Sequence, residues 1–418
     1  MSTWKELEEK LGKRASDAVK KLYDYYGTGW TKWMYDLYDP KTGGFYYSNS
    51  ARDNDEFFTD AESTCQALDM LQELGLFKSV DDDWARALPT EMRETCRKRI
   101  QDMQDPDDGY FYHPQWGKDT AKHHCRLGRD YAQCLSLLNM TGGKPLYKTA
   151  TERMEETVAK NDESEEKSAA FPEHLKSAEA LKAYIDRIFI PNTSHGVGHI
   201  LSSQAMLIKA AGLAEVCLEH MDTYQSAETG YWGEGKEHEY DKISGIIKLG
   251  GLYGVLGGRM KYMDKVIDSA IETVLSKSNP DNICLVFNSV GGLGTAVAHV
   301  RRTSDPNATD CTNIDVVMKK VYDRLPEMID ATIEKLDKFR YPDGSYSYLQ
   351  GKSAENMQGV IVSKGLAEGD INGTTVAIYY LLNSLFPLIG AQRIPLLGEE
   401  NYKEFLEVVK KKTAEVKN

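Results

Sequence analysis

The sequence predicts an all-α protein in which two concentric rings of antiparallel helices form an (α/α)6 toroid. Apolar residues recur at intervals of three and four along most of the 418 residues, with little of the alternation that marks strands. Amphipathic and nearly all-apolar segments alternate about six times. Four turns rich in Gly and aromatic residues precede apolar segments, at 39–48, 105–117, 228–235 and 341–351. Self-similarity of this kind is typical of a stacked or closed helical array.

The amphipathic segments combine one apolar stripe with a charged face, as expected for helices on the outside of a domain. They lie at 4–26, 83–104, 175–188, 213–224, 260–276, 314–339 and 401–416. The other segments are apolar or small nearly all round, so they must be buried on most sides. They lie at 57–74, 129–138, 196–211, 243–256, 288–300 and 372–386. The alternation predicts an outer and an inner ring joined by short connections, with the aromatic turns as hairpin loops on one face.

We expect one domain over residues 1–418, because no linker rich in Pro and Ser divides the chain. The stretch near 151–170 crowds acidic and basic residues without apolar periodicity, which predicts a charged, solvated insertion. An α-solenoid is the main alternative architecture. It would require a more uniform repeat than the spacing of the four turns provides.

The composition excludes several classes of partner. The formal net charge of −13 and the absence of Lys/Arg clusters argue against nucleic acid. No uninterrupted apolar stretch is long enough to span a membrane, and the N-terminal residues lack the apolar core of a signal peptide. Seven cysteines without a CxxC pair suit reduced, buried thiols. These features predict a cytoplasmic protein without a membrane or nucleic-acid partner.

Polar residues cluster at the starts of the predicted inner helices. Asp60 and Glu62 open the first, His195 and His199 lie in the third, and Asp370 opens the sixth. The inner helices of an antiparallel double ring all point the same way, so their starts and the aromatic turns converge on one face. We therefore expect a cavity there, with a polar floor and aromatic walls.

Several of these residues also have a purely structural interpretation. Asp60 and Asp370 occupy positions where aspartate caps a helix by accepting backbone N–H bonds. His195 and His199 have the i, i+4 spacing of a zinc-binding pair, but no HExxH motif accompanies them. A pair of imidazoles facing the cavity is the interpretation that the sequence favours, and no metal or other cofactor is predicted.

The chain resembles the (α/α)6-toroid carbohydrate-active enzymes through the segments GGFYYS, TDAEST, HGVGH, TGYWGEG, PDGSYSY and EGDING. This superfamily includes several glycoside hydrolases and the polysaccharide lyases related to the heparinase toroids. The resemblance implies a helical toroid and an enzyme that acts on a carbohydrate. Heparinase-type lyases usually carry an additional β-sheet domain, and no strand-rich C-terminal segment is present here.

The leading hypothesis is a glycoside hydrolase that cleaves an oligosaccharide with two carboxyl groups, one acid and one base or nucleophile. In a closed ring the first and sixth inner helices are neighbours, which brings Asp60 or Glu62 near Glu368 or Asp370. The predicted catalytic residues are Glu62, Asp370, Asp60, His199 and His195. The predicted substrate-binding residues are Trp232, Tyr231, Trp116, Tyr47, Arg129, Asn288, Tyr253, Tyr346 and Asn372.

Three alternatives remain open at this point. A lyase acting on a uronate would use His195, His199 or Tyr253 as the base, with Asn288 or Arg129 to neutralise the carboxylate. A terpene cyclase-like toroid shares the PDG and GGF turns, but the DxDD acid motif of those enzymes is absent. A non-catalytic scaffold would need a cavity lined by apolar residues, whereas the helix starts are polar. The oligomeric state is not predicted.

Overall fold

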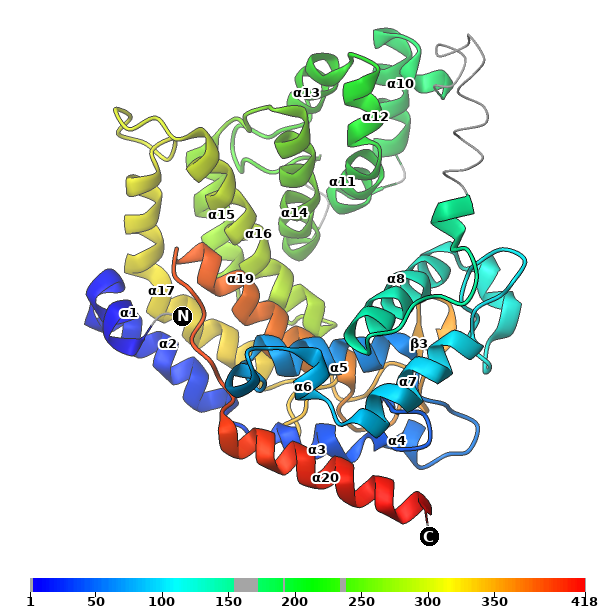
Figure 1. Ribbon diagram of the computed structural model, residues 1–418. Helices are drawn as coiled ribbons and strands as arrows, with labels where there is room; N and C mark the ends of the chain where they lie inside the picture. The colour runs from blue at the N-terminus through cyan, green and yellow to red at the C-terminus, as the bar shows by residue number, and fades with distance from the viewer. Residues whose placement is uncertain (1–2, 154–171, 191, 234–237, 418) are drawn as a thin grey trace. The chain divides into compact units, whose positions relative to one another are not determined.

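The computed structural model describes residues 3–153, 172–190, 192–233 and 238–417, and most of them lie in helices (Figure 1). In this part of the chain the strands form two short antiparallel hairpins. These are Tyr38–Asp39 with Gly44–Phe45 (β1 and β2) and Asn356–Met357 with Val360–Ile361 (β3 and β4). The prediction of an all-α protein is therefore confirmed.

Internal contacts divide the chain into two compact units. Unit 1 consists of Met1–Leu22, Glu166–Leu336 and Tyr380–Arg393, and unit 2 of Tyr23–Glu165, Asp337–Tyr379 and Ile394–Asn418. The expected charged insertion near 151–170 falls almost entirely outside the described residues. The single domain over 1–418 stays a prediction.

Unit 1 contains three of the predicted inner segments and the end of the sixth, and they pack against one another in chain order. The helix α11 contacts α14, α14 contacts α16, and α16 contacts α19. These inner helices are α11 (Ser194–Ser203), α12 (Ala205–Ala210), α14 (Glu239–Leu256), α16 (Ile283–Thr303) and α19 (Leu381–Leu388). Glycines let two of them approach closely, since a Cβ added to Gly245 of α14 would lie 2.5 Å from the hydroxyl of Ser194.

The amphipathic helices of unit 1 pack outside this row. The helix α10 contacts α13, and α15 contacts both α16 and α17. Their bounds are η3 (Glu173–Leu175), α10 (Ala178–Phe189), α13 (Ala214–Asp222), α15 (Met263–Leu275) and α17 (Ile314–Leu336), with α1 (Trp4–Leu11) and the start of α2 (Lys13–Tyr26). Amphipathic and apolar helices therefore alternate along this part of the chain, and their arrangement in an outer and an inner ring stays a prediction.

Unit 2 is centred on α5 (Ala61–Glu73), which packs against α8 (His124–Met140) on one side and α18 (Ile371–Thr375) on the other. Nearly all of α5 is buried, as its apolar composition requires. The remaining helices are α3 (Trp30–Asp36), α4 (Asn49–Arg52), η1 (Lys78–Val80), α6 (Trp84–Ala87), α7 (Thr90–Asp102), η2 (Gly117–Lys122), the π-helical η4 (Val376–Tyr380) and α20 (Glu399–Lys417).

The four aromatic turns are true structural repeats. Gly43, Gly109, Gly230 and Gly344 hold equivalent positions and have φ angles of 68°, 77°, 74° and 85°, which are accessible at low cost only to glycine. In each turn the residue three positions after the glycine donates its backbone N–H to a carbonyl eight or nine residues earlier. Each glycine also packs tightly against another backbone segment, and an added Cβ at Gly109 would lie 2.3 Å from the carbonyl oxygen of Lys148.

The repeat also explains where the aromatic residues of the turns lie. The residue two positions after each glycine is aromatic and buried, with an exposed fraction of 2% or less; these residues are Phe45, Phe111, Trp232 and Tyr346. The residue four positions after the glycine is Tyr47, His113 or Tyr348 in the three repeats of unit 2. This second position contributes side chains to the candidate site described below.

The structure differs from the predicted segments in identifiable places. The segment 83–104 is two helices, α6 and α7, because Pro89 lacks an N–H to continue the first. The segment 372–386 is interrupted by η4, and 196–211 breaks near Gln204. The sequence did not predict α3, a short helix in which five of seven residues are buried.

One described helix, α16, is long and apolar enough to span a membrane by length and composition. Its 18-residue window has a mean hydropathy of 1.6, and 56% of that window is buried. A buried core helix passes the same test, and α16 lies between α14, α15, α17 and α19.

Candidate functional site

A buried cluster of charges lies at the start of α5 in unit 2. The guanidinium of Arg126, which is 1% exposed, pairs with Asp60 at 3.2 Å, Glu62 at 2.8 Å and Asp130 at 2.9 Å. The cation comes from α8 and two of the acids from the start of α5, so the network joins the two helices (Figure 1). Burial alone would lower the pKa of Arg126, but the three carboxyl groups together raise it.

Glu62 is held by a second arginine as well. Its other carboxylate oxygen lies 2.5 Å from Nη1 of Arg129, whose side chain is 47% exposed. Each oxygen of the Glu62 side chain thus accepts a charge-assisted hydrogen bond from a different guanidinium group. Arg129, predicted to bind substrate, therefore reaches solvent from the edge of the buried cluster.

Asp130 is the least satisfied member of the cluster. Neither of its oxygens makes a well-aligned hydrogen bond to a described residue, although Arg126 lies close. Burial raises the pKa of Asp130 to about 7 against the opposing effect of Arg126. Three carboxyl groups share two arginines here, so the charges of the cluster sum to zero when one of the acids retains a proton.

Asp60 and Asp370 both cap helices. Asp60 accepts the backbone N–H of Ser63 at 2.9 Å at the start of α5, and Asp370 accepts that of Gly373 at 2.7 Å at the start of α18. The second oxygen of Asp370 accepts the backbone N–H of Tyr348 at 2.7 Å. Both carboxyl groups thus have the structural role that the sequence allowed as an alternative. Asp370 is fully buried, and burial raises its pKa to about 7 despite these N–H donors.

Tyr47 connects the two ends of the site. Burial raises the pKa of Tyr47 well above the ordinary value, and the negative charges of Asp370 and Glu62 raise it further. Both carboxyl groups therefore act electrostatically on the same hydroxyl. The hydroxyl makes no hydrogen bond of good geometry to a described residue. The Gln66 side chain on α5 donates to that of Asn372 on α18 at 3.2 Å, which ties the two helix starts together.

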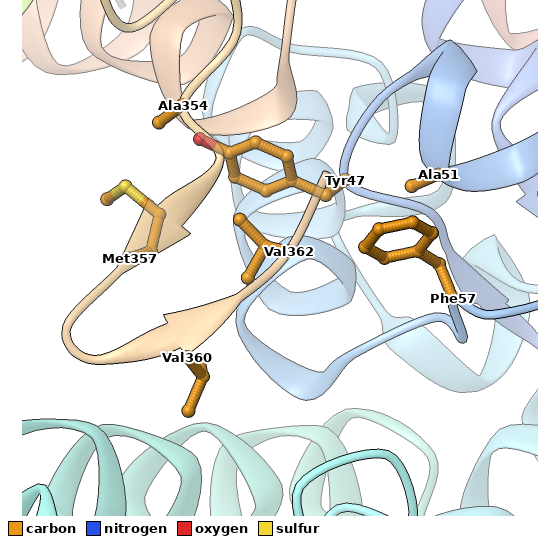
Figure 2. Packing of buried hydrophobic residues seen from close by; sticks show 7 residues of the cluster. All are labelled: Tyr47, Ala51, Phe57, Ala354, Met357, Val360 and Val362. Atoms are coloured by element: carbon orange, nitrogen blue, oxygen red, sulfur yellow. The ribbon is translucent and has the colours of Figure 1, made fainter. Parts of the chain in front are cut away.

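The β3–β4 hairpin covers this region (Figure 2). Tyr47, Ala51 and Phe57 form one apolar cluster with Ala354, Met357, Val360 and Val362 of the hairpin segment. Figure 2 shows the Tyr47 ring reaching toward the hairpin segment, with its hydroxyl oxygen near Ala354. The carbonyl of Ile361 accepts hydrogen bonds from the side chains of Gln115 at 2.9 Å and Trp116 at 3.1 Å. These contacts close the hairpin over the site.

Trp116 and His113 form a second layer beside the charges. The Trp116 ring has His113 at 4.2 Å between centroids and the Arg126 guanidinium at 4.4 Å. The ring is therefore occupied by protein groups, which disagrees with its predicted role as a free platform for a sugar. His113 lies within hydrogen-bond distance of the carbonyl of Thr59, at 3.0 Å, and burial lowers its pKa to about 4.

The site residues predicted from the sequence do not include His113, Arg126 or Asp130, although Asp130 belongs to the polar residues at the start of the second predicted inner helix. His113 could have been found, because it occupies the same repeat position as Tyr47, four residues after a turn glycine. Arg126 and Asp130 show only an i, i+4 pattern within a charged segment, which ordinarily marks a solvated face.

The other predicted residues of the aromatic walls are mostly packing residues. Trp232 is 2% exposed, Tyr231 is 6% exposed, and Tyr253 and Tyr346 are fully buried. The hydroxyl of Tyr253 donates to Asp222 at 2.5 Å, and burial together with Asp222 raises its pKa far above neutrality. These rings offer no face to a sugar, so their predicted role in substrate binding is not supported by their burial.

The remaining predicted residues belong to unit 1. Asn288 donates to the hydroxyl of Ser244 at 3.0 Å. His195 is half-buried and His199 is exposed, both on α11. Burial, followed by Lys248 and His199, lowers the pKa of His195, so the neutral imidazole is its form at neutral pH. Among the described residues no group of three His, Cys, Asp or Glu side chains could hold a metal ion.

Comparison with known proteins adds no relative to this description: no protein family, no curated protein and no solved structure matches the chain.

Proposed function

We propose that unit 2 carries the catalytic centre of an enzyme that cleaves a glycosidic bond in an oligosaccharide by hydrolysis. One observation carries the proposal: the carboxyl groups of Glu62 and Asp370 both act on the Tyr47 hydroxyl, and their surroundings differ. Glu62 pairs with two arginines, whereas Asp370 is fully buried with its pKa raised to about 7. Pairs of carboxyl groups in such different environments are the pattern by which acid and base roles are assigned.

The roles follow from these environments. Asp370, protonated in part near neutral pH, donates the proton to the leaving oxygen, and ionised Glu62 acts as the base or nucleophile. Arg129 reaches solvent beside Glu62 and binds a substrate hydroxyl, and Asn372 lies next to Asp370 at the start of α18. His195 and His199 belong to unit 1, whereas the residues of this set belong to unit 2.

Substrate access requires movement of the β3–β4 hairpin. Asp370 is fully buried, and the hairpin packs on Tyr47 through the apolar cluster of Figure 2. The hairpin is held at Ile361, whose side chain is 44% exposed, by two hydrogen bonds from Gln115 and Trp116. Breaking two such bonds costs on the order of 1–3 kcal/mol, and exposing the apolar cluster of Figure 2 adds to this cost, so substrate binding must supply both.

The test uses Glu62→Gln and Asp370→Asn on an oligosaccharide that the protein cleaves. Asparagine caps a helix as well as aspartate does, so Asp370→Asn removes the titrating proton and keeps the bond from Gly373 at the start of α18, while the bond from Tyr348 to the second oxygen is lost. Each variant should lose about 10² to 10⁴ in turnover. Asp83→Asn, which changes the cap of α6, is the matched control and should keep full activity. Normal turnover in both site variants, with unchanged melting temperatures, would contradict the proposal.

A β-elimination on a uronate is the second candidate, favoured by His195. Its lowered pKa leaves a neutral imidazole on α11 that can accept a proton at neutral pH. Tyr253, the other base considered, is buried against Asp222 and is unsuited to this role. A lyase would generate an unsaturated product that absorbs ultraviolet light, and its formation should stop in His195→Ala but persist in Glu62→Gln.

The (α/α)6 toroid is part of the same proposal. It is supported by the order α11, α14, α16, α19 in unit 1 and by the packing of α18, α5 and α8 in unit 2. These seven helices cover the six predicted inner segments, because α18 and α19 both belong to 372–386. A crystal structure tests it through the contact between α8 and α11 that a closed ring requires. A ring left open at that point would contradict the toroid and favour a solenoid.

A further inference from the structure

A cluster of basic side chains lies on the seam between α11 and α14 in unit 1. His195 and His199 are one helical turn apart on α11, and Lys248 lies on α14, the helix most extensively packed against it. Gly198 lies between the two histidines. A Cβ added there would come 2.8 Å from the Cβ of Lys248, so the lysine stem rests directly on the α11 backbone.

Among the described residues, Asp241 is the acid that acts on His195. The charges of Lys248 and His199 both disfavour protonation of His195, and Asp241 acts in the opposite sense. The half-buried Lys248 makes no hydrogen bond or ion pair to any residue in the described parts of the chain. By contrast, Lys320 elsewhere in unit 1 pairs with Asp268 at 2.8 Å. Among the described residues, the groups at this seam that are positive or can become positive are therefore Lys248, His195 and His199.

We propose that His195, His199 and Lys248 form a binding site for an oxyanion, either the carboxylate of an acidic sugar or a phosphate group. The lysine ammonium provides up to three donors and each imidazole one or two, a combination suited to an anion with several oxygens. His195 also lies in the first turn of α11, where the helix dipole favours negative charge. The site goes beyond the hydrolysis proposed for unit 2 and does not depend on it.

The binding should depend on pH in a defined direction. A bound anion favours the imidazolium form of His195, so affinity rises as the pH falls toward the ordinary pKa of histidine. The charged groups that act on His195 are Lys248, His199 and Asp241. In the free protein, Lys248 and His199 oppose protonation of His195, and the negative charge of a bound anion offsets the effect of both.

The experiment measures binding by calorimetry and by NMR of the imidazole carbons, which is feasible because the chain has nine histidines. The probes are inorganic phosphate, glucuronate, glucose and Zn²⁺. We expect phosphate or glucuronate to bind and to raise the pKa of His195, and glucose to leave it unchanged. Preference for glucuronate over phosphate identifies an acidic sugar as the source of the oxyanion, and the reverse identifies a phosphate group.

Two variants on α14 separate this site from general electrostatics. Lys248→Gln should weaken anion binding about tenfold or more, the loss expected for one charge-assisted hydrogen bond. Lys242→Gln removes the same charge from the same helix at a residue that is not among the groups acting on His195, and it should bind like the wild-type protein. Equal weakening by both substitutions, binding of Zn²⁺ without any oxyanion, or no shift of His195 with either anion would overturn the proposal. None of these readouts uses turnover, so they stand apart from the test of unit 2.

Discussion

Replacing Arg126 with methionine should strongly destabilise unit 2. The side chain is 1% exposed and lies within 3.2 Å of three carboxyl groups, and methionine conserves much of its volume without its charge. Three acids of the cluster then have one remaining arginine.

The magnitude follows from what each acid retains. Glu62 keeps Arg129, and Asp60 keeps the backbone N–H and hydroxyl of Ser63 at 2.9 and 2.7 Å. Asp130 keeps no well-aligned hydrogen bond among the described residues. The change therefore resembles the removal of one partner from a single buried ion pair, which costs about 3–5 kcal/mol, and not three such losses. Protonation of Asp130 relieves part of this cost, so the loss in the free energy of unfolding caused by Arg126→Met should be smaller at pH 5 than at pH 8.

The assay is hydrogen exchange resolved by peptide, read over α5 and α8, because the two units need not unfold together. Arg129→Met is the matched control: the residue lies on the same helix, contacts Glu62 alone among the acids, and is 47% exposed, so the loss should be about 1 kcal/mol or less. A loss below about 1 kcal/mol for Arg126→Met, independent of pH, would refute the view that this cluster holds α5 and α8 together.

Three further predictions concern the turns and the titrating groups. Gly109→Ala should cost about 2–5 kcal/mol in the free energy of unfolding, because the new Cβ meets the carbonyl of Lys148 in addition to the strain at positive φ. Gly142 has a φ of 71° and open space around it, so Gly142→Ala should cost only about 1–2 kcal/mol; equal losses for the two variants in denaturant titrations would show that packing is irrelevant. The raised pKa of Asp130 stabilises the fold at low pH, and this contribution is lost as the pH rises toward about 7. Asp130→Asn should therefore flatten the decline in the free energy of unfolding between pH 5 and 8. An unchanged dependence on pH would disprove the raised pKa of Asp130. His113 should stay neutral in NMR titrations until the pH approaches 4, and titration near 6.5 would mean that its ring is hydrated.

The helices were largely predictable because their apolar periodicity extends over many residues. The six inner segments all correspond to observed helices, although the helix ends differ from the predicted ones by several residues. Among the outer segments, 83–104 divides into two helices at Pro89, before α7. The capping roles of Asp60 and Asp370 were also foreseeable, since both precede apolar runs. What the periodicity could not indicate was η4, because a single π-helical turn leaves no distinct pattern of apolar residues.

The candidate site was less predictable, and the reason is physical. Hydropathy does not distinguish an aromatic ring that lines a cavity from one that fills a core, so Trp232 and Tyr346 were assigned to a wall although both are buried. Arg126 meets Asp60 and Glu62 across more than sixty residues of chain, and no local pattern encodes such a pairing. Aligning the four turns on their glycines would have indicated further site residues, because His113 and Tyr348 hold the same repeat position as Tyr47.

The most direct test of the central claim is to incubate the purified protein with neutral and uronate-containing oligosaccharides while following reducing ends and ultraviolet absorbance together. Hydrolysis in unit 2 predicts that new reducing ends appear without an absorbing product, and that Glu62→Gln abolishes their release. An increase in absorbance that matches the new reducing ends would contradict hydrolysis and assign the reaction to elimination. The absence of cleavage across the whole panel would contradict the assignment of a carbohydrate-cleaving enzyme itself.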